Sequence, residues 1–231
     1  MKIALVTGAN RGIGFECCRQ LAQDNHQVIL TSRDEAKGKA AVAELQQQHD
    51  TIIYQQLDVN DTESVKRLAG WVKQTYGRLD ILINNAGINY DTGERPSTVD
   101  LDDTRHTLNV NLFGPWRMCQ AFLPLMQQQG YGRIVNVSSG SGMLSGMGAE
   151  TPSYGVSKAA LNALTIKLAA EVRGAGVLIN AVCPGWVRTD MGGSAAPRSL
   201  EEGADSVLWA ALLPDDGPTG AFFRDGRRLE W

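Results

Sequence analysis

Short apolar runs alternate with longer helical segments along almost the whole chain, and this alternation constrains the fold more than any other feature. The apolar runs, which are rich in β-branched residues, lie at 2–6, 27–30, 51–56, 81–84, 133–138, 177–182 and 221–223. Helical patterns lie between and after them, at 12–24, 34–48, 62–76, 98–129, 153–172 and 199–212. Strands that are apolar on both faces are typical of a parallel sheet covered by helices. The repeated βα units therefore predict an α/β fold with a doubly wound, seven-stranded parallel sheet and helices on both faces.

The 231 residues contain no linker, tandem repeat or low-complexity tract, so we expect one domain over residues 1–231. The net charge is −3 at pH 7 without a long basic run, which argues against nucleic acid or an anionic membrane as a partner. A short apolar run follows Met1 and Lys2 and gives way to glycines, unlike a secretory signal or a membrane span. We therefore expect a cytoplasmic protein.

The residue types that most often bind metals are scattered along the chain. The four cysteines form no CxxC pair, and the three histidines are dispersed. We interpret the cysteines as small buried thiols in a reducing compartment. No metal site is expected from this pattern.

A glycine-rich turn, "TGANRGIG" (7–14), follows the first strand and opens the first helix. Small residues let a diphosphate approach the backbone, and the N-terminus of the helix supplies N–H groups and a partial positive charge. A plain tight turn is the alternative, but the place of the turn between strand and helix favours binding of a dinucleotide. The residues assigned to this contact are Gly8, Asn10, Arg11, Gly12, Ile13 and Gly14.

The end of the second strand indicates which dinucleotide is bound. NAD-preferring folds usually carry an acid there, which binds the ribose 2′-hydroxyl. Here the position holds Ser32, followed by Arg33, and Arg11 lies in the glycine turn. Two cations without that acid suit a 2′-phosphate. We therefore predict NADPH/NADP+ as cofactor in preference to NAD.

The stretch "YGVSK" places Tyr154 and Lys158 one turn apart on a predicted helix. Side chains at positions i and i+4 are neighbours. Because a nearby cation favours the phenolate, we expect Lys158 to lower the pKa of Tyr154 toward neutral pH, where it transfers protons efficiently. An ordinary surface pair of Tyr and Lys is the alternative, which this short motif alone does not exclude.

Seven motifs occur in a characteristic order: "TGANRGIG" (7–14), "LDV" (57–59), "NNAG" (84–87), "NVNLFG" (109–114), "GRIVNVSS" (132–139), "YGVSK" (154–158) and "NAVCPGWVRTDM" (180–191). With them the chain resembles the short-chain dehydrogenase/reductase family over essentially its full length. Within the family it is most similar to NADPH-dependent carbonyl reductases, although it lacks the long insertion before the tyrosine found in the animal enzymes. The resemblance implies a Rossmann-like fold and an NADP(H)-dependent oxidoreductase.

The resemblance also implies roles for individual residues. The catalytic group would be Asn111, Ser139, Tyr154 and Lys158, with Tyr154 and Lys158 also contacting the cofactor. Further cofactor contacts would come from Asp58 and Val59 near the adenine, from Asn85, Ala86 and Gly87 along the ribose, and from Pro184, Gly185, Val187 and Thr189 near the nicotinamide. A purely structural role remains open for the "NNAG" and "PGWV" segments, as a strand end and a turn.

Two members of the catalytic group carry specific hypotheses. Ser139 keeps the family's strand end, whereas Ser141 restores the usual spacing to Tyr154; we favour Ser139 because a strand fixes position and a loop absorbs extra residues. Pro115 has no N–H, so the carbonyl of Asn111 loses its usual helical partner. That carbonyl is then free to hold a water that passes protons from Lys158 to solvent; a simple bend of the helix is the alternative.

The predicted reaction is hydride transfer to a ketone, aldehyde or quinone carbonyl. An NADP-dependent alcohol dehydrogenase and a non-catalytic cofactor-binding regulator remain as alternatives. Loops 88–97, 140–151 and 186–198 are expected to line a pocket for a small molecule, and the loop at 184–198 to act as a substrate lid. The apolar residues expected there are Trp186, Met143, Leu144 and Met147, which also suit a packed core. A homodimer or homotetramer is the favoured assembly, by the resemblance.

Overall fold

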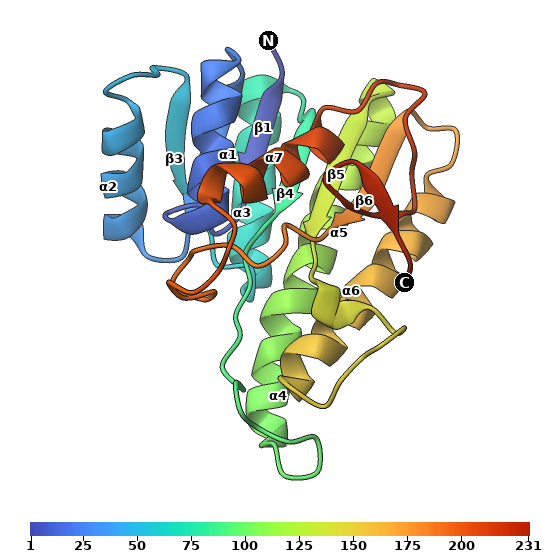
Figure 1. The fold of residues 1–231 in the computed structure, drawn as a ribbon. Coiled ribbons are helices and arrows are strands. Elements are labelled where there is room, and N and C mark those ends of the chain that lie inside the picture. Colours follow the sequence, from blue (N-terminus) through green and yellow to red (C-terminus); the bar gives the residue numbers. More distant parts are fainter.

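Eight strands form one sheet in the order β3-β2-β1-β4-β5-β6-β7-β8 in the computed structural model, which describes residues 1–231 (Figure 1). Their bounds are β1 (Ile3–Val6), β2 (Gln27–Ser32), β3 (Ile52–Gln56), β4 (Ile81–Asn84), β5 (Gly132–Val137), β6 (Val177–Val182), β7 (Phe222–Arg224) and β8 (Arg227–Leu229). The first seven pair in parallel, as the sequence predicts. The eighth was not predicted: it turns back at Asp225–Gly226 and pairs antiparallel with β7.

The seven α-helices are α1 (Gly12–Gln23), α2 (Glu35–Leu45), α3 (Thr62–Tyr76), α4 (Leu101–Leu108), α5 (Gly114–Gln129), α6 (Pro152–Glu171) and α7 (Leu200–Ala211). Six of them cover the two faces of this sheet, whereas α4 lies beyond the sheet and packs against α6 (Figure 1). Successive strand side chains point to opposite faces, so Leu5 packs with α3, α5 and α6 while Ala4 and Val6 pack with α1, α2 and α7. The doubly wound architecture expected from the sequence is therefore confirmed.

The long helical segment predicted at 98–129 is divided in the structure. Asp100 caps α4 by accepting a hydrogen bond from the N–H of Asp102 at 2.7 Å. A π-helical turn, η1 (Asn109–Phe113), then joins α4 to α5, and the N–H of Gly114 reaches back five residues to the carbonyl of Asn109. Pro115 follows in the first turn of α5. Because proline cannot donate the next helical bond, the irregular turn lies where the sequence predicts a kink.

The carboxyl ends of the parallel strands meet at one edge of the sheet. The strand order reverses between β1 and β4, and in such sheets ligands bind in the crevice at that reversal. The loops that follow β1, β4, β5 and β6 gather there. No helix combines the length and the apolar character needed to span a lipid bilayer.

Candidate active site

The glycine turn after β1 leaves its backbone open. Gly8 has a φ of 62°, in the left-handed region, and a Cβ atom there would stand 2.8 Å from Ala86 Cα. A side chain at Gly14 would overlap the Asn85 amide. The N-cap residue of α1, Arg11, makes no side-chain capping bond, so no side chain of the cap residue occupies the first N–H groups of the helix. The first N–H groups of α1 are available as donors, and the glycines leave room beside them. Both features suit the binding of a diphosphate.

The "NNAG" segment holds this turn in place. Asn85 Nδ2 donates to the carbonyls of Thr7 (2.9 Å) and Gly8 (3.0 Å). In return, Thr7 Oγ1 accepts hydrogen bonds from the backbone N–H groups of Asn85 and Ala86, each at 3.0 Å. The Asn85 side chain therefore supports the glycine turn, which is the structural role that the sequence left open for this segment. Gly87 lies next to Asn111 and Lys158, two members of the predicted catalytic group.

The end of β2 lacks a carboxylate that faces the crevice. Ser32 is buried, and its hydroxyl donates to the carbonyl of Asp34 at 2.7 Å. The Asp34 carboxylate accepts from the N–H of Lys37 and so caps α2. Arg33 is exposed between them. Arg11, the second predicted cation, forms an exposed ion pair of 2.5 Å with Asp190.

The segment after β3 lies beside α5. Asp58 Oδ1 accepts a hydrogen bond from the N–H of Asn60 at 2.9 Å, and the Asp58 N–H donates to Ser64. Val59 is buried against Gly114, where a Cβ atom would stand 2.9 Å from Val59 Cγ2. These contacts fix the loop next to the end of β2, the place at which the resemblance puts the adenine.

Tyr154 lies in the first turn of α6, and Ser139 follows the end of β5. Ser139 lies close enough to Tyr154 to favour the phenolate, but burial is the larger effect and raises the pKa of Tyr154 to about 12. The expectation that Lys158 lowers this pKa is therefore not met in the protein alone. Lys158 Nζ lies 5.5 Å from the Tyr154 ring centroid and is directed to a backbone carbonyl instead.

Lys158 is almost fully buried, with 4% of its surface exposed. Its Nζ donates to the carbonyl of Val137 at 2.8 Å. Burial lowers the pKa of the ammonium group to about 8, because a low-dielectric environment disfavours the charged form. The site thus holds a neutral phenol and, at neutral pH, a mostly protonated amine one helical turn apart.

The two candidate serines differ in what they contact. Ser139 is the one that lies close enough to Tyr154 to affect its pKa. Ser141 belongs to the 3₁₀ turn η2 (Gly140–Gly142), and its backbone N–H donates to Ser139 Oγ at 3.1 Å. The geometry therefore favours Ser139 as the partner of the tyrosine and gives residue 141 a supporting position.

Asn111 is fully buried in η1 and uses its whole carboxamide. Its Oδ1 accepts from the N–H of Ile88, and its Nδ2 donates to the Ile88 carbonyl, both at 2.9 Å. The same Nδ2 donates to Ser157 Oγ at 3.0 Å. A Cβ atom at Gly87 would stand 3.5 Å from both Asn111 Oδ1 and Lys158 Nζ. Asn111 therefore connects the loop after β4 to α6 by hydrogen bonds, at a position next to Lys158.

The loop after β6 lies over the glycine turn. Residues 184–198 close on themselves through a β-bridge between Val187 and Arg198 and a hydrogen bond of 2.8 Å from Trp186 Nε1 to the carbonyl of Gly192. A Cβ atom at Gly12 would stand 3.5 Å from Thr189 Cγ2. The predicted nicotinamide segment, from Pro184 onward, is thus brought to the same crevice as the cofactor turn.

The four residues predicted to line an apolar pocket do not share one environment. Trp186, Leu144 and Met147 are exposed. Met143 instead packs against the cluster of Ala181, Cys183 and Phe222, together with Trp231. The packed-core alternative is therefore correct for this methionine.

Sequence reasoning did not identify three residues near the catalytic group. Asp91 accepts the N–H of Ser153 at 2.5 Å and so holds the first turn of α6. Cys183 Sγ accepts from the N–H of Gly140 at 3.2 Å and from Arg224 Nη2 at 2.9 Å. No motif marks Asp91 or Arg224, which the topology of the sheet brings to the site; Cys183 lies within the motif at 180–191, but its contacts could not be inferred from that motif. No group of three or more His, Cys, Asp or Glu side chains is placed to hold a metal ion.

Comparison with known proteins gives a consistent result. A family model described as short chain dehydrogenase matches residues 2–199. Carbonyl reductase [NADPH] 1 of Bos taurus is 37% identical over 278 aligned positions, which cover 99% of this chain and 98% of the relative. (+)-Neomenthol dehydrogenase of Arabidopsis thaliana is 37% identical and is matched over 96% of this chain and 95% of its own length.

A solved structure shares the fold closely. The NADPH-bound carbonyl reductase from chicken fatty liver superimposes with a TM-score of 0.89 at 30% identity, covering 100% of this chain and 98% of that one. The alignment with the bovine relative spans 278 positions, although this chain has only 231 residues. The relative therefore carries residues that have no counterpart here.

Proposed function

The chain belongs to the short-chain dehydrogenase family, and from this premise we propose that it is an NADPH-dependent reductase of ketone, aldehyde or quinone carbonyls. One observation carries the proposal: Tyr154 lies close to Ser139 and beside the buried Lys158. These groups follow strand ends at the same edge of the sheet as the glycine turn. The bovine relative is named as an NADPH carbonyl reductase, and the chicken structural neighbour as an NADPH-bound carbonyl reductase.

NADP(H) is the cofactor, and the reduced form supplies the hydride for the carbonyl carbon. Gly8 and the start of α1, where the backbone is open, would hold the diphosphate of the cofactor. Arg33 and Arg11 would bind the 2′-phosphate of the cofactor. Residue 32 is a serine, so no carboxylate at this position would repel the phosphate. A wild-type kcat/KM that is similar for NADPH and NADH would contradict this assignment.

The chain's own residues handle the carbonyl oxygen. Ser139 donates a hydrogen bond that orients this oxygen and stabilises its developing charge. Tyr154 donates the proton, and its pKa of about 12 keeps it protonated at neutral pH. The Lys158 ammonium stabilises the phenolate that remains.

Asn111 and Lys158 complete the proton route. Both border Gly87, and Pro115 has no N–H with which to bond the Asn111 carbonyl. A water on that carbonyl connects Lys158 with solvent. An ordered water between Asn111 O and Lys158 Nζ in a high-resolution crystal structure would support this route, and a filled helical bond at Asn111 O would contradict it.

The direct test is an NADPH-oxidation screen over a panel of ketones, aldehydes and quinones. Tyr154→Phe should reduce turnover of any active compound by about 100-fold or more, since general acid catalysis contributes about 10²–10⁴-fold. NADPH binding, followed by fluorescence, should change little. Retained turnover in this variant would contradict the role of the tyrosine.

The oxidative direction is the second candidate. A relative with 37% identity is named as a dehydrogenase of an alcohol, (+)-neomenthol. The same residues serve this direction, with Tyr154 as base. A parallel screen of alcohols with NADP+ separates the two candidates, because only the preferred direction gives high kcat/KM at physiological cofactor concentrations.

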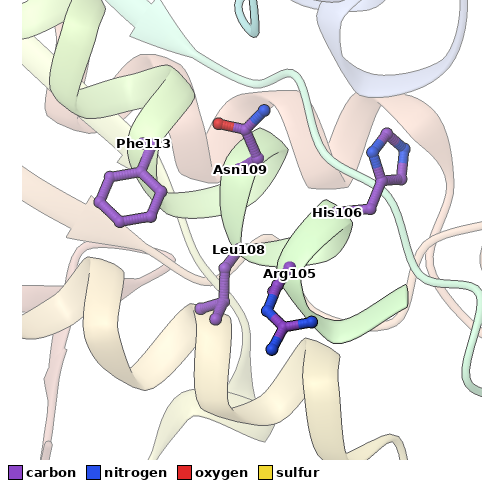
Figure 2. Close-up of a pocket in the computed structure, with 5 residues that line it drawn as sticks. All are labelled: Arg105, His106, Leu108, Asn109 and Phe113. Carbon is purple, nitrogen blue, oxygen red and sulfur yellow. The ribbon is translucent and has the colours of Figure 1, made fainter. Parts of the chain in front are cut away.

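We also propose that two copies of the chain pair through α5 and α6. Phe113 and Trp116 stack at 6.3 Å, and both are exposed, as are Val156 and Ile166 on α6. A hollow of about 360 Å³ at the α4–α5 junction continues this surface (Figure 2), lined by Arg105, His106, Leu108, Asn109 and Phe113. Light scattering should give twice the mass of one chain, and Trp116→Glu should give a monomer. A monomeric wild type at micromolar concentration would contradict the pairing.

A further inference from the structure

An arginine without a counter-ion lies beside the proposed catalytic serine. Arg224 is the last residue of β7, and its Nη2 donates to Cys183 Sγ at 2.9 Å. The same sulfur accepts the N–H of Gly140, which directly follows Ser139. A Cβ atom at Gly140 would stand only 3.2 Å from Arg224 Nη2. The guanidinium group therefore lies next to the backbone segment that follows Ser139, and both are bound to the same sulfur atom.

Strand alternation places Arg224 on the face of the sheet that α6 covers. Phe223 packs with α7 on the opposite face, whereas Phe222 packs with Cys183. Arg224 is two residues beyond Phe222 and so shares its face. Tyr154 projects from α6 on this same side, so the cation and the catalytic hydroxyls lie on the same face of the sheet.

The positive charge of Arg224 has no partner within the protein. None of the ion pairs of the structure includes it. The adjacent carboxylate, Asp225, is bound at both oxygens by Arg198, at 2.7 and 2.8 Å. Arg224 Nε is buried and has no hydrogen-bond acceptor, and its Nη2 reaches only a thiol, which is a weak acceptor.

A half-buried cation in this state is unusual. Buried donors in folded proteins nearly always find an acceptor, and buried charges are usually paired. The planar fork of an arginine matches a carboxylate in a bidentate arrangement. The position next to Ser139 means that an anion bound here would belong to the molecule whose carbonyl contacts the serine.

We propose that Arg224 binds a carboxylate of the substrate, so that the preferred substrates are aldehydes or ketones that carry this group. The inference rests on the function proposed above. In the reaction, the hydride of NADPH goes to the carbonyl carbon and one proton goes to its oxygen. The carboxylate is unchanged, and the products are a hydroxy acid and NADP+.

Matched substrates test the inference directly. Kinetics would be measured for 2-, 3- and 4-formylbenzoate and for their methyl esters, which keep the aldehyde and the ring but remove the charge. The variants are Arg224→Met, which removes the charge, and Arg224→Lys, which keeps it. Arg228→Met is the matched control, because this arginine is exposed on the neighbouring strand β8.

We expect the wild type to prefer at least one formylbenzoate over its ester. Arg224→Met should raise KM for that acid by about 10- to 100-fold, as expected for a lost charge-assisted hydrogen bond, with KM for the ester within about twofold. Arg224→Lys should keep part of the preference, and Arg228→Met all of it. A binding measurement provides a second readout: 4-(hydroxymethyl)benzoate should bind the wild-type enzyme with NADP+ more tightly than it binds Arg224→Met.

Three results would overturn the inference. The first is a wild type that prefers the ester at all three ring positions. The second is an equal loss of kcat/KM for acid and ester in Arg224→Met, which would mean that the arginine only supports Cys183 and Ser139. In the third, no aldehyde in the series and no member of the carbonyl panel is reduced, which would contradict the proposed function as well; reduction of the ester without preference for the acid contradicts the inference alone.

Discussion

Lys158 donates its hydrogen bond to Val137, the last residue of β5, and not to Tyr154. The bond joins α6 to the strand from which Ser139 follows two residues later. It holds the ammonium group inside the protein, where burial lowers its pKa to about 8. The position of one helix against one strand thus determines both where this cation lies and when it loses its proton.

Replacing Lys158 with methionine should separate activity from stability. We expect carbonyl reduction to fall by about 100-fold or more, a typical effect of losing a proton-transfer group. At pH 7 the free energy of unfolding should rise, because a buried cation with a lowered pKa opposes folding while it is charged. Urea unfolding of both proteins at pH 7 measures this, and a variant that is clearly less stable there would contradict the prediction.

The pH dependence of stability should carry the same signature. The pKa of Lys158 is about 8 in the folded protein, compared with 10.5 for a lysine outside the fold. The unfolded chain therefore binds more protons than the folded protein between these two pH values. Wild-type stability should therefore rise from pH 8 toward pH 10, relative to Lys158→Met. Parallel slopes for the two proteins in urea titrations would show that the lysine does not titrate in this way.

The reductive rate should fall as pH rises through about 8. Tyr154 stays protonated over this range, since its pKa is about 12, so the loss reports deprotonation of Lys158. The profile of kcat/KM between pH 6 and 10 measures it. A kcat/KM that stays constant up to pH 10 would show that the reaction does not depend on the charge of Lys158.

The two serines should differ in their effect on kcat. Ser139→Ala removes the hydroxyl close to Tyr154 and should lower kcat by about 100-fold, the size of effect seen when an oxyanion donor is lost. Ser141→Ala keeps the backbone N–H that supports Ser139 Oγ and should lower kcat by less than about fivefold. The reverse order would identify Ser141 as the catalytic serine.

A glycine pair tests the cofactor turn. Gly8→Ala places a Cβ atom 2.8 Å from Ala86 Cα at a φ of 62°, and should weaken NADPH binding by at least about tenfold through strain in the turn. Gly70→Ala, in α3, meets no atom within 4 Å and should raise stability slightly, since alanine favours helix. Fluorescence titration with NADPH compares them, and equal affinities would contradict a role for Gly8.

Much of the architecture could be predicted because it depends on periodic patterns. The strand at 81–84 and the helix at 62–76 have the predicted bounds, since the strand is a short apolar run and the helix lies between the capping residues Asp61 and Gly77. The division of segment 98–129 into two α-helices and a π-helical turn could not be predicted. A π-helical turn differs from an α-helix only in the carbonyl to which each backbone N–H donates. β8 was missed because three residues with two arginines resemble a loop.

The site was predictable where motifs are local and less so where it depends on contacts distant in sequence. Tyr154 and Lys158 are neighbours on one helix, so their spacing was informative. The pKa of Tyr154 could not be predicted, because the burial that raises it comes from the surrounding fold. Arg224 is marked by no motif at all, and only strand pairing brings it to Gly140.

The short strand β8 also affects how copies of the protein behave in concentrated solution. It is the last strand on its side of the sheet, and Arg227 and Arg228 are both exposed on it. Charged residues on a very short edge strand prevent a second sheet from adding to it. Without it, the edge would be β7, with the aromatic pair Phe222 and Phe223. Resistance to aggregation thus depends on a three-residue strand that takes no part in catalysis.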